Sequence, residues 1–129
     1  MVGLKTNKKM ENSEIIEIQK QICNKYGIKF EPCELDLKLG ISLNIIEKNY
    51  EMPIYASRLR VENGTNGWYI WAGEYSEDDD FFKPLHASHL AEYCPLLLPY
   101  LGLAPGSKVL IAENGNYVDV WEDLSLLEI

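Results

Sequence analysis

The densest group of chemically capable side chains in this 129-residue sequence is an acidic run over residues 74–80. Carboxylates at this density suit hard cations such as Ca²⁺, but the run lacks the Asp-x-Asn/Asp-x-Asn/Asp-Gly spacing of a calcium-binding loop. A solvated acidic loop is the simplest interpretation. Recognition of a basic protein is the next, because clustered charge steers association. The candidate partner-binding residues are Glu74, Glu77, Asp78, Asp79 and Asp80.

His86 and His89 form the second candidate group. On a helix, residues three apart share a face and could ligate a metal. No third ligand stands at a standard spacing, and Ala87 occupies the place of the glutamate in the His-Glu-x-x-His motif of zinc hydrolases. Structural histidines are therefore favoured, and the sequence locates no serine, cysteine or aspartate partner for a catalytic histidine. We expect no catalytic residue, no metal site and no cofactor.

An aromatic segment directly precedes the acidic run. In a strand, Trp68 would face one side of the sheet, whereas Tyr69 and Trp71 would face the other. One side should belong to the core, and the other is either exposed or covered by Phe81 and Phe82. Exposed aromatic side chains beside carboxylates would form a protein-binding patch. The same face could instead serve a receptor for a small molecule or a peptide.

Composition places these groups on an acidic domain of ordinary size. Twenty Asp and Glu residues against twelve Lys and Arg residues give a net charge of −8, which disfavours binding to nucleic acid or to anionic membranes. No apolar run is long enough to span a membrane. Three cysteines without a secretion signal indicate free thiols in a reducing cytoplasm. We expect a flexible basic tail over residues 1–10 and a single domain over residues 11–129.

Periodicity and turn signals predict the elements that would position these residues. Apolar residues at three- and four-residue steps predict a helix over 13–26, and alternation predicts a strand over 30–46. Asn-Gly turns predict two β-hairpins, and two short helices stand between them. The fold class is therefore α+β: an antiparallel twisted sheet built from hairpins, with an N-terminal helix and a central helical segment packed on it. The hairpins pair 54–62 with 68–73 and 108–113 with 117–121, the short helices cover 85–93 and 95–101, and 122–129 is an acidic tail.

Several stretches of the sequence form a recognisable pattern when taken in order. The most specific are Asn-Gly-Trp-Tyr-Ile-Trp-Ala-Gly-Glu at 66–74 and Asp-Asp-Phe-Phe-Lys-Pro-Leu-His at 79–86. Leu-Lys-Leu-Gly-Ile-Ser-Leu-Asn at 37–44 precedes them, and Pro-Tyr-Leu-Gly-Leu-Ala-Pro-Gly at 99–106 and Asp-Val-Trp-Glu-Asp at 119–123 follow. In this order the stretches resemble the bacterial immunity protein thirty-three-like domain family. The resemblance covers residues 20–125.

The resemblance implies a small cytoplasmic protein of a polymorphic toxin system, which binds and neutralises a partner toxin stoichiometrically and is not an enzyme. The net charge favours a basic toxin domain as the partner. The alternative is a small-molecule or metal-binding domain that uses His86, His89 and the acidic run. Neither reading indicates an oligomeric state. The family signature, which is either structural or forms a shared site, comprises Gly67, Trp68, Trp71, Gly73, Phe81, Phe82, Pro84, His86, His89 and Trp121, together with Glu74 and Asp80.

Overall fold

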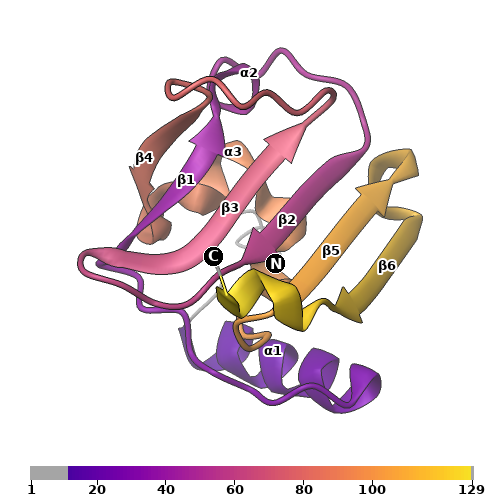
Figure 1. Ribbon diagram of the computed structural model, residues 1–129. Coiled ribbons are helices and arrows are strands. Elements are labelled where there is room, and N and C mark those ends of the chain that lie inside the picture. The colour runs from indigo at the N-terminus through magenta and orange to yellow at the C-terminus, as the bar shows by residue number, and fades with distance from the viewer. Residues whose placement is uncertain (1–11, 129) are drawn as a thin grey trace.

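The computed structural model describes residues 12–128, so the basic tail expected over residues 1–10 lies outside the described residues. Helices and strands follow one another along the chain as Figure 1 shows. With η denoting a 3₁₀-helix, the elements are α1 (Asn12–Tyr26), β1 (Lys38–Ser42), α2 (Leu43–Ile46), β2 (Ile54–Arg58), β3 (Thr65–Ala72), β4 (Phe82–His86), η2 (Ala87–His89), α3 (Leu90–Tyr93), η3 (Pro95–Tyr100), β5 (Ser107–Ala112), η4 (Glu113–Gly115), β6 (Tyr117–Glu122) and η5 (Leu124–Glu128).

The strands form one sheet in the order β4-β1-β3-β2-β5-β6. The two predicted hairpins are confirmed as β2–β3 and β5–β6, both antiparallel. β1 and β3 are parallel, which makes the sheet mixed rather than wholly antiparallel. The reason is that the chain runs along β1, returns along β2 and then runs forward again along β3, which lies between them.

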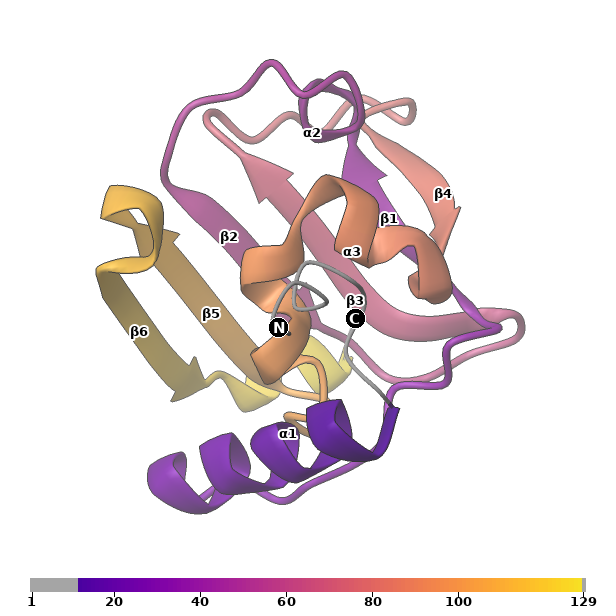
Figure 2. The same ribbon diagram turned by 180° about the vertical axis from the view of Figure 1, so that it is seen from behind.

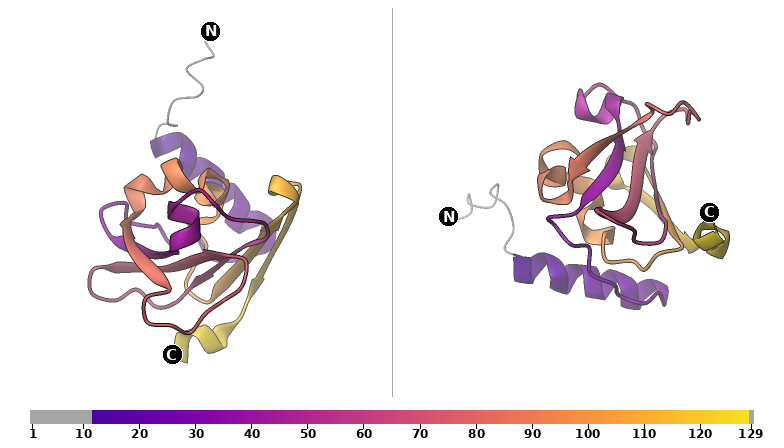
Figure 3. Two further views of the ribbon diagram at one scale, coloured as in Figure 1. Left: turned by 90° about the horizontal axis from the view of Figure 1, so that it is seen from above. Right: turned by 60° about the vertical axis from the view of Figure 1, so that its left-hand side comes forward.

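A helical segment covers one face of this sheet and α1 lies at one end, which confirms the α+β class. α3 and η3 cover the face turned toward the viewer in Figure 2. The predicted N-terminal helix is confirmed as α1, which lies across the end of the sheet in Figure 3 and packs on η3. The Nε2 atom of Gln19 in α1 donates a hydrogen bond to the carbonyl oxygen of Leu98 in η3, at 2.8 Å.

The core lies between the sheet and its helical layer. Alternation along each strand directs every second side chain into it, and burial of this apolar surface is the main force that holds the layers together. The largest side chains with less than 2% exposure are Trp68, Leu39, Ile41, Ile45, Ile54, Ile70, Leu90, Leu97, Leu101, Leu103 and Ile111, together with Arg58.

The strand predicted over 30–46 is wrong at both ends. Only Lys38–Ser42 pairs with other strands, and Leu43–Ile46 forms the short helix α2 instead. Before β1 the N–H of Leu37 donates to the carbonyl of Glu34, so the chain turns there. The alternating leucines do not mark a buried face in this segment, because Leu35 is 37% exposed.

The helix predicted over 85–93 begins too early. Leu85 and His86 are the last residues of β4, where they pair with Leu39 and Lys38 of β1. Cross-strand hydrogen bonds therefore replace the first helical turn, and helical structure begins at Ala87. The acidic tail predicted over 122–129 also contains structure, because η5 forms there and buries Leu126.

Arg58 occupies the end of β2 with only 1% of its surface exposed. Its guanidinium donates to the carbonyl oxygens of Glu31, Pro32, Asn66, Leu101 and Leu103, at 2.8 to 3.4 Å. Burial lowers the pKa of Arg58 from its ordinary value, but arginine remains protonated in proteins. The buried charge is therefore satisfied by backbone carbonyls from three separate segments of the chain.

We expect Arg58→Lys to lower the free energy of unfolding by about 3 kcal/mol, because lysine cannot reach carbonyls on three sides at once. Urea unfolding followed by tryptophan fluorescence would measure the loss. The matched control is Arg60→Lys at the neighbouring exposed arginine, which should change stability by less than about 0.5 kcal/mol. Equal effects of the two substitutions would contradict the structural role of Arg58.

Candidate functional site

The face of the sheet that is turned toward the viewer in Figure 1 carries no helix within residues 12–128 other than the short η5 at its lower end. β3 supplies the centre of this face. Alternation directs Trp68 and Ile70 into the core, so Tyr69 and Trp71 lie on the opposite side. The expectation that one side of the aromatic strand belongs to the core is therefore confirmed, and the other side is half-buried.

Six aromatic side chains gather on the open side of the sheet and are termed the aromatic face. The ring of Tyr55 stacks on Trp71 with centroids 5.3 Å apart. Phe82 lies edge-on to Tyr69 at 5.2 Å and to Trp71 at 6.0 Å. Tyr75 extends the group through edge contacts with Trp71 and Phe81, at 5.3 and 5.4 Å. The aromatic face consists of Tyr55, Tyr69, Trp71, Tyr75, Phe81 and Phe82.

Tyr55 is a member of this face that the sequence-based candidates lack. It pairs directly with Trp71 in the β2–β3 hairpin. Residues directly opposite in an antiparallel pair point to the same side of the sheet. Counting outward from the Asn-Gly turn does not identify it: the turn pairs Glu62 with Thr65, and that count would place Tyr55 opposite Ala72, one residue from its actual partner.

Gly40 forms part of the floor beneath the aromatic face. It lies beside Tyr69 of β3 and Pro84 of β4 in the sheet. A Cβ atom at this position would lie 2.6 Å from the Tyr69 ring, so a larger residue would push the ring away. The missing side chain thus lets Tyr69 lie over β1 and reach Phe82.

Residues 74–80 lie in the loop from β3 to β4 and border the aromatic face. Their five carboxylates, here termed the acidic rim, are all exposed: Glu74, Glu77, Asp78, Asp79 and Asp80. The N–H of Phe81 donates to the carbonyl oxygen of Asp78 at 2.9 Å, a turn that returns the chain to the sheet. Within the described residues no lysine or arginine forms an ion pair with the rim. The structure therefore brings the acidic and the aromatic candidates side by side.

His86 and His89 do not share a helix, contrary to the arrangement considered from their spacing. His86 ends β4, whereas His89 ends η2, and their exposed rings lie 6.1 Å apart between centroids. In the part of the chain that the structure describes, no three His, Cys, Asp or Glu side chains are grouped to hold a metal ion.

The remaining signature residues divide between scaffold and surface. Gly67 has a φ of +91°, and a Cβ atom there would clash with the carbonyl oxygen of Leu59. Trp68 is fully buried and donates its indole N–H to the carbonyl of Leu101 at 3.0 Å. Trp121 lies on β6 and is 39% exposed. Gly73 directly follows β3 with a positive φ, and Pro84 lies beside Gly40.

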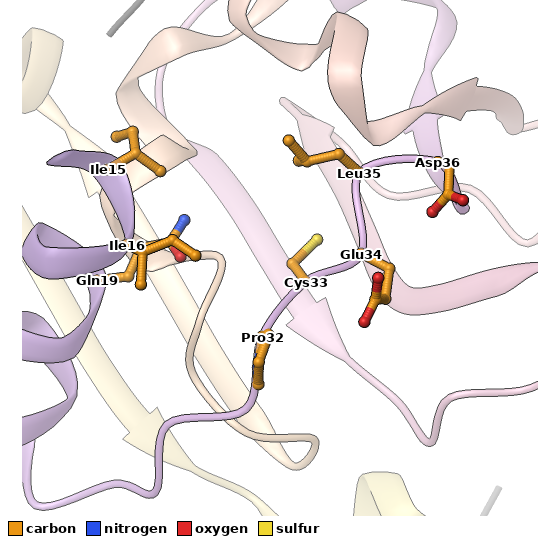
Figure 4. A pocket seen from close by; sticks show the side chains of 8 residues that line it. All are labelled: Ile15, Ile16, Gln19, Pro32, Cys33, Glu34, Leu35 and Asp36. Atoms are coloured by element: carbon orange, nitrogen blue, oxygen red, sulfur yellow. The ribbon is translucent and has the colours of Figure 1, made fainter. Parts of the chain in front are cut away.

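A pocket of about 500 Å³ lies apart from the aromatic face, between α1 and the segment that leads to β1 (Figure 4). The sequence gives no sign of this pocket, because its alternation predicts a strand over residues 30–46 and so places residues 30–37 in the sheet. Side chains of α1 form one wall, and the Cys33 side chain lies on the other. The lining residues are Ile15, Ile16, Gln19, Pro32, Cys33, Glu34, Leu35 and Asp36.

The Cys33 thiol in this pocket is held in its protonated form. Burial raises its pKa to about 11, although the Arg58 charge opposes this. The side-chain amide of Asn66 donates a hydrogen bond to the Cys33 sulfur at 3.1 Å, which also favours the thiolate, but burial has the larger effect on the pKa. A thiol with so high a pKa is a weak nucleophile at neutral pH. The raised pKa of Cys33 therefore does not favour covalent cysteine chemistry in this pocket.

Comparison with known proteins gives one finding. The family model described as the Imm33-like domain matches residues 18–123, which is most of the chain. No curated protein and no solved structure matches it significantly. Among the described residues, no helix has the length and apolar character needed to cross a membrane.

We expect the thiols of the native protein to react slowly with iodoacetamide at pH 8. Burial raises the pKa of Cys33 and of Cys94 to about 11, so about 0.1% of each is thiolate at that pH. The alkylation rate should rise steeply until pH approaches about 11. Mass spectrometry of native and urea-unfolded samples would measure it. If native Cys33 reacted at pH 8 as fast as in urea, the pocket would hold an activated nucleophile instead.

Proposed function

We propose that this chain, which belongs to the Imm33-like domain family, is an immunity protein of a bacterial polymorphic toxin system. It binds one partner toxin stoichiometrically and neutralises it without catalysing a reaction. The observation that carries the proposal is the family match over residues 18–123, which spans all six strands of the sheet.

The charge of the chain favours a basic toxin. Its net charge is −8, and five carboxylates of the acidic rim stand without a cationic partner within the described residues. Toxins that act on nucleic acid need a basic surface to bind phosphates. An acidic protein can occupy such a surface and speed the encounter by electrostatic attraction.

The open face of the sheet offers a surface of suitable size. Six strands about 4.8 Å apart and about 20 Å long span roughly 25 by 20 Å. That area is of the same order as the ~800 Å² that each partner contributes to a standard protein interface. Its backbone is held by cross-strand hydrogen bonds, so little conformational entropy is lost when a partner binds.

The cytoplasm is the compartment in which this protein meets its partner. Cys23, Cys33 and Cys94 are all free thiols. Free thiols persist where glutathione and thioredoxin keep the surroundings reducing.

We expect one gene beside that of this chain to encode a product that is toxic alone and tolerated when the chain is co-expressed. The two proteins should then copurify at equal stoichiometry, measured by light scattering after size-exclusion chromatography. Screening weakens attraction between exposed charges, so raising NaCl from about 0.05 to about 0.5 M should weaken the complex by about tenfold or more.

Three results would contradict the proposal. One is that no neighbouring gene product is toxic, and another is that a toxic one remains toxic in the presence of this chain. The third is rescue at clearly substoichiometric amounts, because a single molecule would then inactivate many toxin molecules and would act as an enzyme.

A further inference from the structure

The rings of the aromatic face are held in place by contacts with one another, and they remain partly exposed to a binding partner. Trp71, Tyr69 and Phe82 are half-buried by one another, and Tyr75 is 57% exposed. Ring contacts of 5.2 to 6.0 Å fix Trp71 and Phe82 against their neighbours. Rings held in place before binding lose little entropy on contact, which is why Trp and Tyr dominate the strongest positions of protein interfaces.

The surroundings of the aromatic face are negative on the side of Tyr75. Glu74 directly precedes Tyr75, Glu77 follows it two positions later, and the aspartates at 78–80 lead directly into Phe81. The nearest lysine in sequence, Lys83, pairs with buried Ile41 in the sheet. Paired residues point to the same side, so Lys83 points to the helical side and leaves the rim uncompensated.

Aromatic rings next to carboxylates provide the chemistry that recognises a guanidinium group. The face of Trp or Tyr attracts a cation within about 6 Å of the ring centre, and arginine is the cation most often found there. Carboxylates accept two parallel hydrogen bonds from the same planar group. An arginine side chain can therefore stack on a ring while its N–H groups reach the rim.

Other occupants fit these observations less well. A second copy of this chain would carry the same net charge of −8. A two-fold interface on this face would bring the two acidic rims close together, and the like charges would repel. A nucleic acid backbone is repelled for the same reason.

We infer that the aromatic face, at Trp71 and Tyr75, binds an arginine-bearing segment of a basic protein, whose guanidinium groups pair with the acidic rim. This inference rests on the proposed function and adds the chemistry of the partner and the place where it binds. The rings supply the contact area, and the carboxylates select cationic side chains over neutral ones.

The first test is a titration of the full chain with an acetylated Gly-Arg repeat octapeptide, followed by ¹H–¹⁵N NMR. The three tryptophans give three indole N–H signals, so each reports on its own position. The signal of Trp71 should move, whereas that of Trp68, which is fully buried, should stay in place. An octapeptide with citrulline in place of arginine, which has the same shape without the charge, should bind at least about tenfold more weakly.

Two variants with matched controls locate the interaction. Tyr75→Ala should weaken peptide binding about threefold to fivefold, whereas Tyr117→Ala, at a tyrosine on β6 that is 50% exposed, should change it less than about twofold. The triple variant E77Q/D79N/D80N should weaken binding about tenfold. The control E17Q/E47Q/E92Q removes the same amount of charge from exposed residues elsewhere. It should weaken peptide binding by less than about threefold.

Three results of the titration would overturn the inference. They are equal losses in the two triple variants, equal affinity for the citrulline peptide, or movement of the Trp121 signal in place of that of Trp71. An unchanged Trp68 signal in each variant shows that the fold is retained, so a loss of binding is then a property of the surface. Dimerisation through Tyr75, detected by sedimentation, would also overturn it.

The toxin found by co-expression separates this inference from the proposed function. If the toxin binds the wild-type chain and the Tyr75→Ala and E77Q/D79N/D80N variants equally well, the inference fails and the proposed function stands. If no neighbouring toxin binds while the arginine peptide shifts Trp71 as described, the proposed function fails and the aromatic face remains a site for arginine-bearing segments.

Discussion

The buried guanidinium of Arg58 is the interaction on which the rest of the structure depends. Its five carbonyl acceptors come from the segment before β1, from the start of β3, and from the segment after η3. A charge at 1% exposure is tolerable only when every donor is satisfied. The three segments are therefore held together at one end of β2, which ties the chain that follows α1 and the chain that follows η3 to the sheet.

Attachment of the helices to one side explains the character of the other side. A sheet with one covered face usually presents polar residues on its open face. Here β3 and β4 place Trp71 and Phe82 there, and these rings reduce their own exposure by packing on one another. The nearby carboxylates keep this apolar area next to strongly hydrated charge. Exposed apolar patches bordered by polar residues are typical of interaction sites in proteins generally.

Patterns among neighbouring residues correctly predicted the elements that form through short-range interactions. The apolar steps of α1 and the Asn-Gly turns of the two hairpins are properties of neighbouring residues, and the structure has all three elements. The parallel pairing of β1 with β3 joins residues about thirty positions apart, and no short pattern encodes it. Arg58 gave no signal either, because an arginine between Ser57 and Leu59 looks like an exposed strand residue. Arg58 is buried only because three segments that are distant in the sequence meet around it in the folded structure.

The sequence was enough to predict most of the residues that make up the candidate site, but not how they are arranged in space. The acidic run and the aromatic strand are both visible in the sequence, whereas their union over one face requires the loop from β3 to return at Phe81. In this arrangement the rings are part of the folded framework, whereas several of the carboxylates are not. The rings are supported by the sheet, with Gly40 leaving room for Tyr69. Glu77, Asp79 and Asp80 accept no hydrogen bond and join no ion pair within the described residues. Their charges can therefore change without cost to the fold, and such a change would alter the charge beside the aromatic face while leaving its rings in place.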